Sequence, residues 1–176
     1  MHTSYDFDKI KFATDHGTFE RAVELYEKGK VTKLKEDDFG FEAIVIGTKP
    51  YHVSVSARHY DQASCDCYVG QNDTLCKHAV AVAIRAVTGG APLDDEDKKQ
   101  TYEPVCSGKL GNVTKTEIEE IKREITSAMK YVKPYNGPSR LWFQYQDSLS
   151  EGCARLSAIV SDLPVSEQTA YLLVGL

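Results

Sequence analysis

Long apolar runs are missing from this sequence of 176 residues. The longest nearly apolar stretch, residues 79–87, is far shorter than the roughly 20 residues that a membrane-spanning helix needs. Residues 1–12 are polar and include acids, unlike the basic and apolar start of a secretory signal. The sequence therefore predicts a cytoplasmic protein without a membrane span.

Basic charge is also scarce, which bears on the kind of partner. The chain has 21 Lys and Arg against 26 Asp and Glu, and neither residues 1–90 nor residues 91–176 have a basic excess. A phosphate-binding surface usually needs such an excess, so DNA binding would depend on a local patch. The cations that could form a patch, and that also fit ordinary surface charges, are Lys49, Arg58, Lys77 and Arg85. The net charge of -5 favours a protein partner, with DNA as the open alternative.

Common catalytic signatures are absent as well. The segment GKLGN, residues 108–112, lacks the Ser or Thr and the upstream glycine of a phosphate-binding loop. Neither Gly-x-Ser-x-Gly nor His-Glu-x-x-His occurs in the sequence. We therefore predict no catalytic residue and no small-molecule substrate, and we expect that the protein is not an enzyme.

Cysteine is rare, but three of the five cysteines fall within one short segment. An odd count excludes complete pairing in disulfides, and without an export signal metal binding or catalysis explains the cysteines better. The segment CDCYVGQNDTLCKH, residues 65–78, reads C-x-C, a short loop, and then C-x-H. Zinc takes four ligands in a tetrahedron, and thiolate and imidazole suit it. The predicted zinc ligands are Cys65, Cys67, Cys76 and His78.

This ligand set requires a particular local structure. Residues two apart in a flat strand point to opposite faces, so Cys65 and Cys67 can share an ion only if the chain bends around Asp66. The second pair lies where a helix is predicted to begin, and the N–H groups of a helix start favour a thiolate there. Because four protein ligands leave no position open for a water, we expect one structural zinc ion per chain.

Other uses of these residues stay open at this point. Cys65 and Cys67 could form a disulfide, although its loop would be strained and a cytosol would reduce it. A redox catalyst would more typically show C-x-x-C. Cys76 and His78 could act as nucleophile and base, but the neighbouring pair would then be unexplained. His59 is the one plausible substitute ligand.

The two remaining cysteines stand apart from the cluster. Cys106 lies in a predicted loop, where it could serve as a further ligand or as a reactive thiol. Cys153 falls on the apolar stripe of a predicted helix. We therefore predict Cys153 as a small core residue.

The N-terminal half predicts an α+β fold. Apolar residues at helical spacing over residues 18–28 predict a helix, which Thr14 or Asp15 can cap and Gly29 can end. Three short segments with strand patterns follow and predict a small antiparallel meander, at residues 31–35, 41–46 and 51–56. Residues 79–87 have almost no polar face and predict a short buried helix.

The C-terminal part predicts a helical segment. Thr114 and Glu117 fit a capping box at the start of its first helix. The apolar stripe of that helix is Ile118, Ile121, Ile125, Ala128, Met129 and Val132. A second helix is predicted from near Pro138 to Leu163, and Ser166 can cap a third that is apolar to the last residue. The predicted regions are residues 1–90, a linker at 91–112 and a helical region at 113–176.

The cluster and its flanks together resemble the SWIM-type zinc finger. The strand YHVSVS before C-x-C, and the apolar helix HAVAVAI that begins at C-x-H, are similar to that family, and FERAVELYEKGKV looks like the helix that precedes the finger in prokaryotic SWIM proteins. The resemblance covers residues 16–90 and implies the same four ligands. The family occurs in chromatin-remodelling ATPases, transposases and kinase-linked proteins, which implies binding to DNA or to other proteins.

The sequence as a whole predicts a structural zinc-binding module that mediates protein or nucleic-acid interaction. The alternative is a non-catalytic zinc-binding portion of a longer enzyme or regulator, whose active part lies beyond residue 176. The apolar C-terminal end favours that alternative, or an interface that covers this end, because a chain seldom stops inside a buried helix without a cap.

Overall fold

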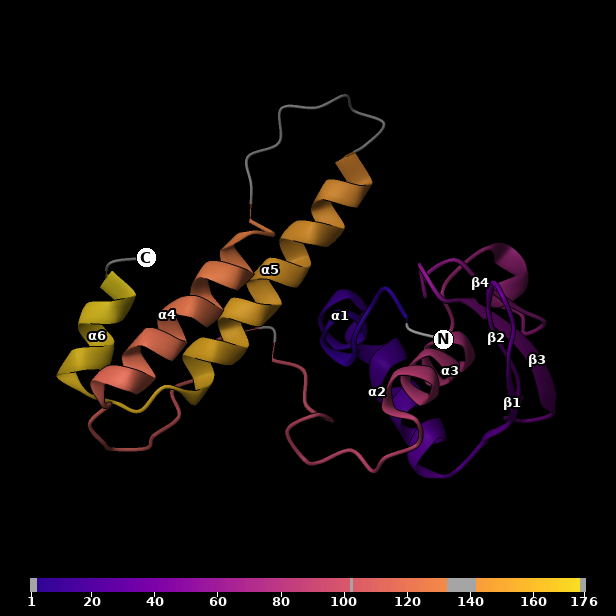
Figure 1. Ribbon diagram of the computed structural model, residues 1–176, viewed down its shortest axis with the longest axis horizontal. Helices are drawn as coiled ribbons and strands as arrows, with labels where there is room; N and C mark the ends of the chain where they lie inside the picture. The colour runs from indigo at the N-terminus through magenta and orange to yellow at the C-terminus, as the bar shows by residue number, and fades with distance from the viewer. Residues whose placement is uncertain (1–2, 102, 133–141, 175–176) are drawn as a thin grey trace. The chain divides into compact units, whose positions relative to one another are not determined.

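The structure, a computed structural model, describes residues 3–101, 103–132 and 142–174 (Figure 1). The chain forms two compact units, Met1–Lys99 and Gln100–Leu176. The boundary between the units falls inside the predicted linker, so that segment is shared between them. In the described part of the chain, no helix is both long and apolar enough to span a membrane.

The first unit contains a four-stranded antiparallel sheet in the order β1-β2-β3-β4. Its strands are β1 Val31–Glu36, β2 Gly40–Ile46, β3 Pro50–Ser56 and β4 Ala63–Cys65. Buried positions alternate along the central strands, with Phe41, Ala43 and Val45 in β2 and Val53 and Val55 in β3. The predicted α+β meander is confirmed, and β4 is a strand that the sequence did not predict.

Three helices pack on one side of this sheet: α1 Phe7–Ala13, α2 His16–Glu27 and α3 Lys77–Thr88. α3 lies directly on the strands, and α1 and α2 pack against α3 (Figure 1). The carboxylate of Asp15 accepts the N–H of Thr18 and caps α2, which decides between the two predicted caps. α3 begins two residues before the predicted helix and therefore contains His78.

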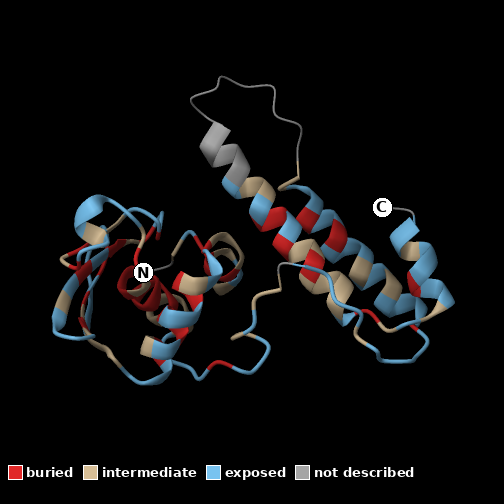
Figure 2. Ribbon diagram, turned by 180° about the vertical axis from the view of Figure 1, so that it is seen from behind, coloured by how far each residue is buried: buried red, intermediate tan, exposed pale blue. Residues whose placement is uncertain are grey.

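α3 is the centre of the core of the first unit. Every residue from Ala79 to Ile84 is buried, because the sheet covers one side of the helix and α2 covers another. Figure 2 shows buried residues along α3, and also on α2 and on the strands of the sheet. Each buried Val or Ile contributes about 1.5–3 kcal/mol relative to an exposed one. Burial on several sides explains why residues 79–84 carry no polar side chain.

Residues 91–99, which follow α3 and include several acids, belong to the first unit. Leu93 is buried in its core. The ammonium group of Lys11 donates a hydrogen bond of 2.7 Å to the carbonyl oxygen of Glu96. Lys98 forms an ion pair of 3.0 Å with Glu27 in α2. These contacts hold a segment that was predicted as solvated linker against the helical side of the unit.

The second unit consists of α4 Lys115–Met129, α5 Trp142–Asp162 and α6 Glu167–Val174. The predicted capping box is present, since the Glu117 N–H donates to the Thr114 hydroxyl at 3.3 Å and the Thr114 N–H donates to the Glu117 carboxylate at 2.7 Å. The C-terminal helical segment is thus confirmed. The predicted start of the second helix near Pro138 lies outside the described residues.

The contact between α4 and α5 uses a different face of α5 from the predicted apolar stripe. Gly152 packs against the end of α4 and the turn after it, since a Cβ atom there would lie 3.4 Å from the Ala128 carbonyl oxygen and 2.7 Å from the Val132 side chain. Glu151 is fully buried beside it and forms an ion pair of 2.9 Å with Arg155. Cys153 is exposed, so its prediction as a core residue is wrong. Close approach at a glycine, rather than burial of the bulkiest side chains, sets how these helices pack.

Candidate metal centre

The four predicted ligands lie at the two ends of the loop between β4 and α3. Cys65 is the last residue of β4, and pairing with β3 fixes its position. The chain bends at Asp66, as shared coordination requires, and places Cys67 beside Cys65. Cys76 is the N-cap residue of α3, and His78 lies in the first turn of that helix. Two elements of the core therefore hold the two ligand pairs.

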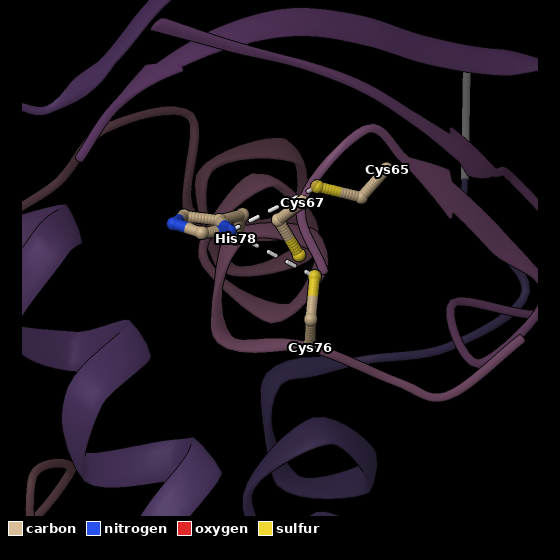
Figure 3. Close-up of side chains that lie close together, drawn as sticks. All are labelled: Cys65, Cys67, Cys76 and His78. Carbon is tan, nitrogen blue, oxygen red and sulfur yellow. Dashed lines mark hydrogen bonds between the residues drawn. The ribbon is translucent and has the colours of Figure 1, made fainter. Parts of the chain in front are cut away.

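The four side chains converge with a spacing that fits zinc (Figure 3). One donor atom from each residue lies within 4.8 Å of the other three. The Nδ1 atom of His78 is 3.8 Å from the Cys65 Sγ atom and 4.0 Å from the Cys76 Sγ atom. Tetrahedral zinc, with bonds of about 2.3 Å to sulfur and about 2.0 Å to nitrogen, places sulfur and nitrogen about 3.5 Å apart. The cluster is therefore consistent with one zinc ion.

The imidazole ring of His78 is oriented by its neighbours. Tyr51 in β3 stacks on it, with ring centroids 4.4 Å apart and planes inclined by 27°. Gly47 lies so close that a Cβ atom there would be 2.9 Å from the Tyr51 ring and 3.1 Å from the His78 Nε2 atom. In Figure 3 the Nδ1 atom faces the sulfurs and the second ring nitrogen points away. Neither the contact of Tyr51 nor that of Gly47 with His78 was predicted from the sequence.

The loop between the ligand pairs also supports the site directly. It contains the short 3₁₀ helix η1, Gly70–Asn72. The Gly70 N–H donates to the Cys67 Sγ atom at 3.3 Å. A Cβ atom at Gly70 would lie 2.5 Å from the Cys65 carbonyl oxygen, so only glycine allows this approach. The contacts of Gly70 with both cysteines of the first pair were not predicted from the sequence.

Burial sets the protonation of the cluster before a metal binds. It raises the pKa of the Cys65 and Cys76 thiols, because a buried thiolate loses its hydration. Burial also acts to raise the pKa of Cys67, but hydrogen bonds, foremost from the Gly70 N–H, outweigh it and lower that pKa. Burial lowers the pKa of His78, which favours the neutral ring that can bind a metal.

Zinc affinity is expected to rise with pH. Zinc binds thiolates, and the raised pKa values of Cys65 and Cys76 mean that at least these two thiols must release a proton for each zinc bound at neutral pH. Protons therefore compete with zinc below those pKa values, whereas a neutral His78 releases no proton on binding. The apparent affinity should rise at least about a hundredfold for each pH unit near neutrality. Competition with a chromophoric chelator at several pH values measures this slope, and a flat profile would contradict thiolate ligation.

The other candidate residues lie outside the cluster. His59 and Cys106 are exposed, and neither belongs to the group of converging donors. All five cysteines lie among the described residues, and none is in a disulfide. The alternative bond between Cys65 and Cys67 is therefore not formed.

Two of the four predicted phosphate-binding cations lie far apart. Lys49 and Arg58 flank opposite ends of β3, a strand of seven residues that is roughly 20 Å long. The Lys49 ammonium lies over the Tyr51 ring, 5.5 Å from its centroid. Lys77 and Arg85 are half-buried in α3. Lys49 and Arg58 are therefore too far apart to form one compact patch.

The chain was compared with curated proteins, solved structures and protein-family models. Neither the curated proteins nor the solved structures gave a match. The family model described as SWIM zinc finger matches residues 51–86. That range begins in β3, ends in α3 and contains all four converging donors. The resemblance to the SWIM-type zinc finger is therefore confirmed over residues 51–86.

Proposed function

We propose that the first unit is a zinc-organised module that mediates protein interaction and that its zinc ion is structural. The observation that carries the proposal is the convergence of four buried protein donors at zinc-like spacing. Structural zinc sites are closed in this way, whereas catalytic ones keep a position for water or substrate. We propose no catalytic role for this centre.

The site can stabilise the unit because it joins a strand and a helix across the loop that connects them. When bound, zinc would neutralise the thiolates and tie β4 to the start of α3. β4 is only three residues long and pairs on one side with β3. A strand of this length gains little from its own hydrogen bonds. Metal binding and folding of this region would therefore be one event.

Charge supports a protein partner over nucleic acid. The chain carries a net charge of -5, and Lys49 and Arg58 lie at opposite ends of a strand. Affinity for DNA comes largely from cations that contact several neighbouring phosphates. A protein partner needs no such track, since interfaces depend on a few buried aromatic and apolar contacts.

Binding assays on the full zinc-loaded chain distinguish a protein partner from DNA. We expect duplex DNA to bind no more tightly than the non-specific range of about 10⁻⁴–10⁻⁶ M, with a steep loss as salt rises. In affinity capture from the source organism, we expect the wild-type chain to retain a bound protein at moderate salt. The Cys76→Ser variant should not retain it. Tight DNA binding that Lys49→Glu or Lys77→Glu abolishes would overturn the proposal, and Cys153→Ser serves as the matched cysteine control.

A further inference from the structure

The loop between the ligand pairs exposes two apolar side chains. Tyr68 is 84% exposed and Val69 is 42% exposed, directly after the ligand Cys67. Among the described residues, the Tyr68 side chain makes no hydrogen bond, ion pair or ring contact. We call Tyr68 and Val69 the loop tip. A large aromatic ring left in water at this position gives no stability to the fold of the unit.

The backbone that carries the loop tip is nevertheless tightly held. The Gln71 N–H donates to the Cys67 carbonyl oxygen at 2.9 Å. The Asn72 side chain donates to the Tyr68 carbonyl oxygen at 2.6 Å, and the Asn72 N–H donates to the Val69 carbonyl oxygen at 3.1 Å. With the ligands on both sides, these bonds fix the tip before any partner arrives. A preordered loop loses little conformational entropy on binding.

We infer that the loop tip is the contact surface of the module and that it inserts into an apolar pocket of a protein partner. This inference rests on the proposed function and names the surface that would perform it. Tyr68 offers a large rigid ring with a hydroxyl group that can donate at the pocket wall. Tyrosine is enriched among the few residues that dominate binding energy at interfaces. Val69 extends the apolar contact beside the ring.

The charge of the loop itself favours a basic rim on the partner's pocket. Residues 65–76 contain two acids, Asp66 and Asp73, and no Lys or Arg, and Lys77 follows at the start of α3. An aromatic ring could also stack on a nucleobase, but single-stranded nucleic acid is bound by rings set in a basic groove. A pocket rimmed by basic or amide groups complements this loop. The partner is therefore a protein that presents an apolar pocket with a basic rim.

Site-specific photo-crosslinking in cells of the source organism tests the inference on the full chain. The probe is p-benzoylphenylalanine at position 68, and the matched control places it at Phe39, another aromatic residue that is 85% exposed on the first unit. We expect one protein adduct at position 68 and none at position 39. The adduct should disappear when Cys65→Ser is added, because the tip is ordered through the metal site.

Affinity measurements with the purified partner and the full chain then give the contribution of Tyr68 to binding. We expect Tyr68→Ser to weaken binding at least about thirtyfold and Phe39→Ser to change it less than about threefold. A zinc-dependent partner that binds Tyr68→Ser as tightly as the wild type would overturn this inference while leaving the proposed function in place. No zinc-dependent protein adduct at either position, together with no zinc-dependent partner in affinity capture, or an adduct with nucleic acid instead, would overturn both.

Discussion

Removal of zinc is expected to unfold residues 60–88 while α4 and α5 stay folded. The ligand pairs close the loop between β4 and α3, and three gathered thiolates repel one another without a cation. Structural zinc in isolated fingers supplies an apparent free energy of about 10–16 kcal/mol, more than a small unit has in reserve. Because α3 is the centre of the core, β2 and β3 should lose protection as well.

Hydrogen exchange measured peptide by peptide, with zinc content determined on the same sample, tests this expectation. Amides of α3 should exchange at least about a hundredfold faster after chelation, which corresponds to a local loss of about 3 kcal/mol, and those of α4 should not change. Cys65→Ser should reproduce the effect without chelator. Cys153→Ser removes an exposed thiol in α5 and should keep one zinc per chain. Unchanged exchange and circular dichroism after confirmed loss of zinc would rule out the structural role.

The features that the sequence predicted correctly depend on short-range patterns. The capping box of Thr114 and Glu117 is a contact between residues three apart, so it can be recognised from spacing alone. The alternation along β2 and β3 reflects one buried and one exposed face of a sheet. The donor cluster is an exception, because it joins residues on both sides of a loop. Spacing alone does not show that such a loop closes. Zinc chemistry made the convergence of the donors predictable.

The features that the sequence did not predict depend on tertiary contacts. α1 has only seven residues, too few for a helix to be stable alone, and it forms because Ile10 is buried in the core. β4 has three residues and exists through pairing with β3. The stacking of Tyr51 on His78 joins a strand to a helix. No pattern within a single segment contains that contact.

The error at Cys153 has a comparable origin. Helical periodicity correctly placed it with Leu149 and Leu156 on one face of α5, but that face is not the one that meets α4. Gly152, on a neighbouring face, packs instead against Ala128 and Val132 at the end of α4 and just after it. Apolar periodicity identifies the most hydrophobic face of a helix, whereas close approach of backbones can select a neighbouring one.

The substitution Gly70→Ala is expected to weaken zinc binding by about 10–100-fold, the usual effect of disturbing a group that orients metal ligands. The new Cβ atom would lie 2.5 Å from the Cys65 carbonyl oxygen and 2.7 Å from the Cys65 Cβ atom, so the backbone must shift. That shift would also break the hydrogen bond from the Gly70 N–H to the Cys67 sulfur. Gly70 does not have a positive φ angle, so the effect would come from these contacts and not from backbone strain.

Gly17→Ala provides the matched control for this experiment. Gly17 lies in the first turn of α2, and a Cβ atom there meets only the end of the flexible Arg21 side chain, at 3.2 Å. Alanine at this helical position should leave zinc affinity unchanged and raise the free energy of unfolding by up to about 1 kcal/mol. Chelator competition on the wild type and both variants gives the three affinities. Equal affinities for Gly70→Ala and the wild type would show that the loop tolerates a side chain against Cys65, and that the loop does not hold the first ligand pair in place.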